Sequence, residues 1–361
     1  MKSTYRQEDV TILLKDITGM VQPQPTEERE RLIQSGKHYS EMLPIEYSPS
    51  PQYMDAYQSA LRNYSKVTAD AVGVVAQKII EQKGKQVVLV SLARAGTPIG
   101  ILIKRYIRRK YGIDVPHYTI SIIRGRGIDQ NAMKEILRHH EPEQIQFVDG
   151  WIGKGAILHE LEKELKQYPN VSSELAVLSD PANLTKLCGT HEDILIPSSC
   201  LNCTVSGLIS RTFLRKDIIG ANDYHGAVYY EELEPYDLSL EFIQAIEKEF
   251  SLEDGNLEYQ TEKECRALEY SIRQTKGIEE VLQIAKDYSI QDINLIKPGI
   301  GEATRVLLRR VPWKVLIQSG ASNSTMLEHL LRLAQEKGVV IEEYPLKHYK
   351  ACGIIKKCTD I

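Results

Sequence analysis

The sequence predicts an α/β protein with a parallel sheet, followed by a second, smaller α/β unit near the C-terminal end. Short apolar runs at 86–92, 145–148 and 175–180 alternate with segments of helical spacing. Alternation of this kind is typical of a parallel sheet with helices on both faces. From residue 281 a second alternation of helices and strands begins.

The remaining elements are predicted from the spacing of apolar residues and from breaks at glycine and proline. Helices are expected at 57–83, 101–109, 156–165 and 204–214, and a strand at 118–123 leads into an Arg-Gly-Arg-Gly loop. Residues 1–51 form a polar arm with proline breaks, and 230–275 read as a closing helix and a connector. We place the domain limits at 1–255, 256–274 (connector) and 275–361.

Composition narrows the class of protein. The chain has 361 residues, 42% hydrophobic and 26% charged, and a formal net charge of −4. These values are typical of a globular protein and argue against general affinity for nucleic acid. The apolar runs are too short to span a membrane, and the first residues lack a signal-peptide pattern. Six cysteines without a signal peptide indicate a cytoplasmic protein with free thiols. Assembly as a homodimer stays open.

The segment 144–156, QIQFVDGWIGKGA, combines a strand, an acid, a Gly-rich basic turn and a helix start. In such a loop, backbone N–H groups and the helix N-terminus bind phosphate, and the carboxylate reaches sugar hydroxyls. The phosphate-binding residues would be Gly153, Lys154, Gly155 and Ala156 in this loop, with Asp149 as the carboxylate, and Gly96 in an earlier loop, where a glycine lets the backbone approach a diphosphate closely. Neither GxGxxG nor the Walker A pattern is present.

Two earlier loops add cations to the same expected sheet edge. Arg94 and Gly96 follow the strand at 86–92, and Arg124 and Arg126 follow the strand at 118–123. Together with Lys154 they make four cations whose mutual repulsion indicates a polyanionic ligand. The alternative is that these are Gly-rich turns of purely structural origin.

These three loops, in this order, resemble those of type I phosphoribosyltransferases. The resemblance implies that family's parallel sheet, and phosphoribosyl pyrophosphate or a related nucleotide as ligand, bound with Mg²⁺. It assigns Asp149 to the ribose hydroxyls and Arg94, Arg124 and Arg126 to the pyrophosphate, all four as catalytic residues. Gly150 departs from the family, which usually has a second acid there.

A second chemical cluster lies between Cys188 and His225. Cys200 and Cys203 have CxxC spacing, and Cys203 precedes the helix expected at 204–214, whose dipole would lower its thiol pKa. Three interpretations stay open: buried structural thiols, a nucleophile paired with His191 or His225, and a zinc site completed by Cys188 and His191. Zinc is the least favoured because a second CxxC is absent.

The C-terminal stretch 297–310, KPGIGEATRVLLRR, opens a helix with a Gly-x-Gly-Glu turn. Residues 290–355 resemble the PELOTA RNA-binding domain shared with kink-turn-binding ribosomal proteins. The resemblance implies an α/β/α sandwich that binds structured RNA through Lys297, Gly299, Gly301, Glu302, Arg305, Arg309 and Arg310. Residues 297–361 hold seven Lys and four Arg against five Glu and one Asp, a charge of +5 that favours local polyanion binding.

Motifs such as SGKHYSEMLPIEY (35–47), FVDGWIGKGA and IPSSCLNC make the whole chain resemble the StiP family of tellurite-resistance operons. The sequence favours a phosphoribosyltransferase-like enzyme in a stress-linked pathway for a nucleoside-like metabolite. The alternatives are a cysteine peptidase of the StiP type using Cys200 or Cys203, and a non-catalytic nucleotide- or RNA-binding module.

Overall fold

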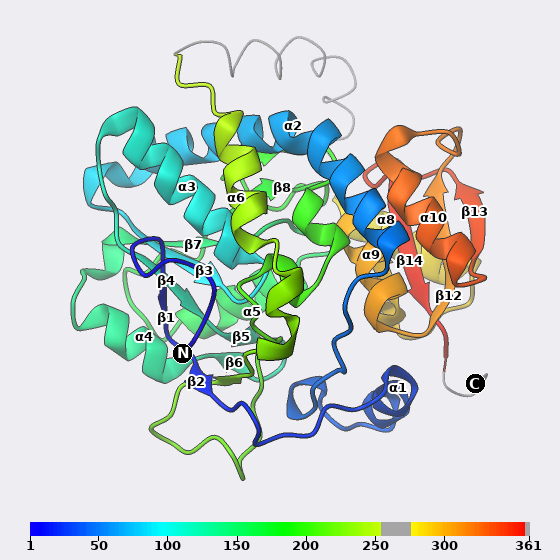
Figure 1. Ribbon diagram of the computed structural model, residues 1–361, viewed down its shortest axis with the longest axis horizontal. Helices are drawn as coiled ribbons and strands as arrows, with labels where there is room; N and C mark the ends of the chain where they lie inside the picture. The colour runs from blue at the N-terminus through cyan, green and yellow to red at the C-terminus, as the bar shows by residue number, and fades with distance from the viewer. Residues whose placement is uncertain (254–275, 358–361) are drawn as a thin grey trace.

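The computed structural model describes residues 1–253 and 276–357 (Figure 1). Its centre is a six-stranded sheet in the order β1-β4-β3-β7-β8-β9, with every adjacent pair parallel. The strands are β1 (Thr11–Ile12), β3 (Val88–Leu92), β4 (His117–Ile120), β7 (Ile145–Val148), β8 (Leu175–Ser179) and β9 (Cys188–Thr190). The predicted parallel sheet is therefore confirmed.

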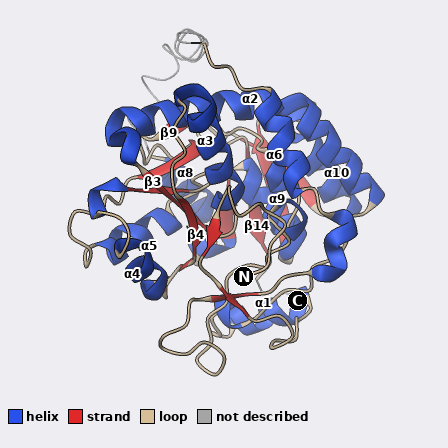
Figure 2. Ribbon diagram, turned by 60° about the vertical axis from the view of Figure 1, so that its left-hand side comes forward, coloured by secondary structure: helices blue, strands red, loops and turns tan. Residues whose placement is uncertain are grey.

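Helices cover both faces of this sheet, as Figure 2 shows. One face carries α2 (Pro51–Lys83), α3 (Gly96–Tyr111) and α6 (Ser239–Lys248), and the other carries α4 (Gln130–Leu137) and α5 (Ala156–Leu165). Because successive side chains of a strand point to opposite faces, Leu89 belongs to the first apolar cluster while Val88 and Val90 belong to the second. Both faces are buried, which explains the continuous apolar runs in the sequence.

Helix boundaries follow local capping chemistry. The helix α2 begins at Pro51 rather than at residue 57, because the Ser50 side chain accepts a hydrogen bond from the Tyr53 N–H and proline occupies the first turn. It ends at Lys83 and is capped by Gly84, which adopts a positive φ of 72°. The helix expected at 101–109 begins earlier, at Gly96, whereas α5 matches its predicted limits.

The helix expected at 204–214 is absent, and that prediction was wrong. The chain makes a single 3₁₀ turn, η5 (Cys203–Val205), and then reverses through Gly207 and Leu208, both with positive φ. Bridges from Ile209 to Tyr229 and from Phe213 to Gly226 follow. Serine hydroxyls supply the competing contacts: the Ser210 hydroxyl accepts a hydrogen bond from the Val228 N–H.

The C-terminal region has its own four-stranded sheet in the order β11-β14-β12-β13. Its elements are α8 (Gly277–Asp287), β11 (Ile296–Pro298), α9 (Ile300–Arg309), β12 (Pro312–Gln318), α10 (Glu328–Glu336), β13 (Val340–Tyr344) and β14 (Ala351–Ile355). The pair β12–β13 is parallel, and β14 is antiparallel to both β11 and β12.

The two regions share one apolar cluster. Ile300 and Leu307 of α9 and Leu330 of α10 belong to the same cluster as Val72 and Val75 of α2. Figure 1 shows α9 and α10 beside α2. The two regions are therefore packed directly against each other. The connector predicted at 256–274 lies outside the described residues.

Smaller elements complete the part of the chain that the structure describes. They are α1 (Thr26–Gln34), the parallel pair β2 (Lys15–Asp16) and β10 (Gly226–Ala227), and the antiparallel pair β5 (Ile122–Ile123) and β6 (Gly127–Ile128). No helix within 1–253 or 276–357 combines the length and apolarity needed to cross a membrane.

Candidate functional site

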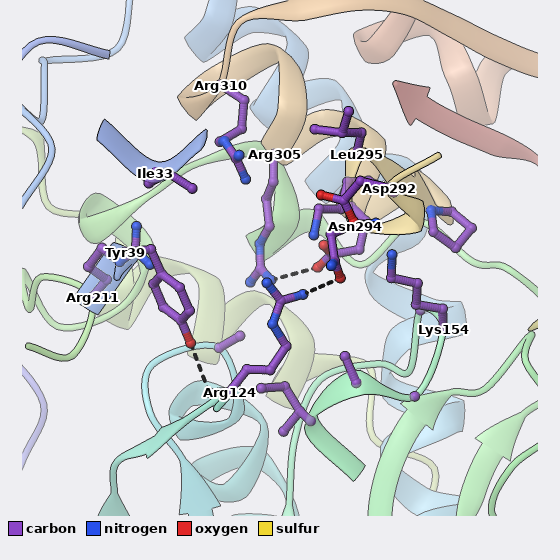
Figure 3. A pocket seen from close by; sticks show the side chains of 18 of the residues that line it. Ile33, Tyr39, Arg124, Lys154, Arg211, Asp292, Asn294, Leu295, Arg305 and Arg310 are labelled. Atoms are coloured by element: carbon purple, nitrogen blue, oxygen red, sulfur yellow. Dashed lines mark hydrogen bonds and ion pairs between the residues drawn. The ribbon is translucent and has the colours of Figure 1, made fainter. Parts of the chain in front are cut away.

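A cavity of about 710 Å³ lies where the two regions meet. Its walls come from α1, the loop after β7, the start of α5 and the segment 292–310. Figure 3 shows Tyr39, Arg124, Arg211, Arg305 and Arg310 around this space. The two sites that the sequence suggested separately, the loop at 149–156 and the basic segment at 297–310, thus meet in a single cavity.

The loop after β7 forms one wall through Asp149 and residues 153–156. Gly155 adopts a positive φ of 85° at the N-cap of α5, and no side chain caps this helix start. The Asp149 carboxylate accepts a hydrogen bond from the Gly150 N–H at 2.7 Å, and burial raises its pKa to about 6. The loop therefore presents uncapped backbone N–H groups beside a carboxylate.

Lys154 joins this loop to the C-terminal region. Its Nζ donates hydrogen bonds to the carbonyl oxygens of Ile293 and Ile296, the latter at 3.1 Å. Burial, assisted by the nearby positive charge of Arg124, lowers its pKa to about 8. Lys154 is therefore a contact between the regions as well as a cation of the cavity wall.

The other cations predicted for the N-terminal loops do not all converge. Arg124 lines the cavity and donates a hydrogen bond to the Asn294 side chain at 2.9 Å. Arg94 is buried, bound to Glu46 at 3.3 Å and to the carbonyl oxygen of Ile209 at 2.8 Å, and faces an adjoining hollow of about 280 Å³. Arg126 is half-exposed and pairs with Glu41 at 2.7 Å.

Gly96 has a packing role. A Cβ at this position would lie 2.5 Å from the carbonyl oxygen of Val148, so the glycine lets the start of α3 approach β7 closely. The same holds for Gly301, where a Cβ would meet the Trp151 ring at 2.7 Å. At both positions close packing explains the glycine.

The residues predicted to bind RNA face the N-terminal region. Lys297, Glu302, Arg305 and Arg310 line the cavity. Arg305 pairs with Glu302 at 3.0 Å and lies over the Trp151 ring at 4.3 Å.

The neighbouring residues make further contacts between the regions. Arg310 makes a two-pronged pair with Glu30 at 2.6 and 2.8 Å, and Arg309 donates to the Asn202 side chain. Gly299, with a φ of 96°, precedes α9, whose Ile300 N–H donates to Asp193 at 3.1 Å. Asp193 of the N-terminal region thus caps a helix of the C-terminal region.

The sequence did not single out two cations of the cavity, Arg29 and Arg211. Arg29 of α1 is 2% exposed, and its Nε has no hydrogen-bond partner among the described residues. Arg211 has its guanidinium 4.5 Å from the centre of the Tyr39 ring. Both lie in segments without glycine-rich turns, so the sequence carries no motif that would single them out.

Cys200 and Cys203 are both buried in the core. Neither thiol makes a hydrogen bond to His191 or His225, and the His225 ring is bonded to the Ser121 hydroxyl at 2.8 Å. Burial raises the pKa of Cys200 to about 12 and also raises that of Cys203. Because the expected helix is absent, the predicted lowering of the Cys203 pKa by a helix dipole does not occur.

Cys188 has a different environment. Its Sγ lies 3.5 Å from Nε2 of His191, whose Nδ1 lies 3.0 Å from the carbonyl oxygen of Asp180 and 3.7 Å from the Asp180 carboxylate. A carbonyl oxygen only accepts, so Nδ1 carries the proton and Nε2 is free to accept one from the thiol. The sequence had paired Cys188 with His191 as zinc ligands rather than as nucleophile and base.

Among residues 1–253 and 276–357, no three His, Cys, Asp or Glu side chains converge as a metal-binding group. The expected Mg²⁺ was to be held largely by phosphate oxygens of a ligand, so it stays a prediction.

Comparison with known proteins agrees with this two-part architecture. Residues 275–357 match the PELOTA RNA binding domain, so the chain is an α/β protein that ends in a domain of that type. Residues 3–247 match the family described as tellurite-like stress resistance cysteine protease StiP. The chain is 37% identical over 367 residues to the cysteine protease StiP of Acinetobacter baylyi, covering 98% of this chain and 94% of that relative. The chain belongs to the StiP family.

Two solved structures of a hypoxanthine-guanine phosphoribosyltransferase from Bacillus anthracis were also found. They are 14% and 15% identical and have TM-scores of 0.25 and 0.26. The alignments cover 41% and 42% of this chain, and 81% and 87% of those chains. At these TM-scores the likeness gives no information on activity.

The phosphoribosyltransferase activity favoured by the sequence is overturned. The family model and the nearly full-length relative both carry the name of a cysteine protease. Of the loops that suggested transfer, those before α3 and α5 are Gly-rich strand-to-helix turns, and the one at Arg124 and Arg126 joins the antiparallel strands β5 and β6. At Gly96 close packing on β7 accounts for the glycine. The StiP and PELOTA resemblances are confirmed.

Proposed function

We propose that this chain is a cysteine peptidase of the StiP type, with Cys188 as nucleophile and His191 as base. The observation that carries the proposal is the 3.5 Å contact between Sγ of Cys188 and Nε2 of His191. Among the cysteines in the described part of the chain, Cys188 alone makes a hydrogen bond to an imidazole. The name of the family and of its relative supports the class of activity.

In this proposal Cys188, His191 and Asp180 divide the proton-transfer and nucleophile roles of thiol-dependent peptide cleavage. His191 accepts the thiol proton, the thiolate attacks the peptide carbonyl, and the imidazolium returns the proton to the leaving amine. Water then hydrolyses the thioester. Asp180 orients the imidazole through its carbonyl oxygen, and its buried carboxylate lies near enough to stabilise the imidazolium.

Substrate must reach a thiol that is covered in this structure. Cys188 is 1% exposed, whereas the His191 side chain is 34% exposed. We therefore expect the substrate to approach across the imidazole, with the irregular connection between β8 and β9 moving aside.

The test compares single cysteine variants on fluorescein-labelled casein. Cys188→Ala should lower the cleavage rate by about 100-fold or more, because the nucleophile is lost. The matched controls Cys200→Ala and Cys203→Ala should keep their activity once melting temperatures confirm folding. Activity that persists in Cys188→Ala and disappears in either control would refute the assignment.

RNA binding by residues 275–357 is a second proposal, favoured by the PELOTA match. The arrangement sets a condition, because Arg305, Arg309 and Arg310 contact residues of the N-terminal region. RNA would have to reach them through the cavity or displace these contacts. Electrophoretic retardation of a structured RNA by the full chain at low salt tests this, and no retardation at any concentration would refute it.

A further inference from the structure

We infer that the cavity between the two regions binds a small molecule carrying two or more phosphate groups. Nine of its lining residues are Lys or Arg, and three are Asp or Glu. The cations come from both regions, with Arg29, Arg124, Lys154 and Arg211 on one side and Lys297 and Arg305 on the other. This site is separate from the Cys188–His191 pair and does not depend on the peptidase proposal.

The carrying observation is a buried guanidinium with an unsatisfied nitrogen. Arg29 is 2% exposed, lines the cavity, and leaves its buried Nε without a hydrogen bond among the described residues. A guanidinium loses strong hydration when it is buried, and folded proteins normally compensate with a carboxylate or carbonyl. The adjacent Glu30 attracts Arg29 electrostatically, but its hydrogen bonds go to Arg310.

Two further cations of the cavity are similarly unpaired. Within the described residues, neither Arg211 nor Lys297 makes an ion pair or a side-chain hydrogen bond, and Arg211 has only the face of Tyr39. Burial and neighbouring cations lower the pKa of Arg211 to about 9. Burial also lowers the pKa of Lys297 to about 7. An anion between these groups would remove their mutual repulsion.

The shape of the cavity favours a small ligand. Its volume of about 710 Å³ lies within the usual range for small-molecule sites, roughly 300–1,000 Å³. The uncapped start of α5 contributes backbone N–H groups to the same wall, and a helix N-terminus favours phosphate. Because the cations lie on several walls of the cavity, a ligand that balances them needs more than one anionic group. We therefore infer a molecule that carries several phosphates.

The experiment is calorimetric titration of the full chain with inorganic pyrophosphate, and with orthophosphate for comparison. Pyrophosphate should bind at least tenfold more tightly than orthophosphate. Arg29→Met and Arg211→Met should each weaken it at least tenfold. The matched control Arg332→Met removes an exposed arginine paired with Glu328 outside the cavity, and it should bind like wild type. Melting temperatures identify any variant that fails to fold.

Each other outcome overturns the inference. These outcomes are no heat of binding, equal loss in Arg332→Met, and unchanged affinity in both cavity variants. A structured RNA that binds while pyrophosphate does not, and that Arg211→Met weakens, would assign the cavity to nucleic acid instead. Cys188→Ala should keep pyrophosphate binding, so failure here is distinguishable from failure of the peptidase proposal.

Discussion

The interdomain cavity and the Cys188 site differ in how their polar groups are satisfied. At the Cys188 site, thiol, imidazole and carbonyl oxygen form a chain of contacts within one segment and its neighbouring strand. In the cavity, nine Lys or Arg side chains face three Asp or Glu side chains, and the Nε of Arg29 has no hydrogen-bond partner among the described residues. The first arrangement needs no ligand to satisfy its polar groups, whereas the second has an excess of positive charge that an anion would balance.

The contact between the two regions also contains a buried ion pair between Arg310 and Glu30. Breaking this pair has the largest expected effect on stability. Glu30 is 1% exposed and accepts two hydrogen bonds from the Arg310 guanidinium. Arg310→Ala would leave a buried carboxylate alone and should lower the free energy of unfolding by about 3 kcal/mol. Urea denaturation measures this. Arg332→Ala, which breaks an exposed pair, should change it by about 0.5 kcal/mol or less.

The pairing of Cys188 with His191 can be tested by measuring how fast the thiol is alkylated. His191→Ala should slow iodoacetamide modification of Cys188 about tenfold near neutral pH, because the imidazole no longer accepts the thiol proton. Peptide mass analysis after timed labelling reports each cysteine separately. Cys200 and Cys203 should stay slow in both proteins, since burial raises the pKa of each thiol. Equal labelling of Cys188 with and without His191 would contradict the pairing.

Removing an unmatched cation should have the opposite effect on stability from removing a matched one. Arg29→Met replaces a buried guanidinium, whose Nε has no hydrogen-bond partner among the described residues, by a shorter apolar chain. We expect the free energy of unfolding to rise by about 1 kcal/mol. Urea denaturation without phosphate measures it. A loss as large as that of Arg310→Ala would show that Arg29 is already matched.

The smallest expected effect is a proton linkage. Burial lowers the pKa of Lys297 to about 7, so its unbound amine is mostly neutral above that pH. A bound anion favours the charged form and raises the pKa again. Pyrophosphate binding should therefore take up protons above pH 7, and the Lys297 contribution to affinity should fall as the pH rises. Calorimetry in two buffers of different ionisation enthalpy detects the uptake. Lys297→Met is the reference, and identical uptake in that variant would contradict the assignment.

Lys297 also makes folding depend on pH in the free protein. Its folded pKa lies below the ordinary value of 10.5, so the unfolded chain binds more protons between about pH 7 and pH 10.5. Its contribution to the free energy of unfolding therefore rises with pH through that window. Lys297→Met should flatten this part of the stability profile.

Local patterns in the sequence were sufficient for much of the architecture. The strand at Ile145–Val148 and the helix at Ala156–Leu165 occur as predicted, because an apolar run and a 3.6-residue period specify them without distant contacts. The same applies to α9, which opens after its glycine turn. The helix expected at 204–214 failed because Gly207 and Leu208 reverse the chain there.

Only the tertiary structure decided what these elements do together. The phosphate-type loop and the basic segment 297–310 are far apart in sequence, yet the packing of the C-terminal region against the N-terminal region places Lys154 and Lys297 of β11 in one cavity. Arg29 is an ordinary helix residue in the sequence, and the fold buries it together with Glu30 while most of α1 stays accessible. Cys188 and His191 are only three residues apart, but a strand end and the Asp180 carbonyl oxygen were needed to turn the imidazole toward the thiol. Spacing in a sequence determines which residues can be neighbours on one element, whereas burial and orientation depend on contacts between elements.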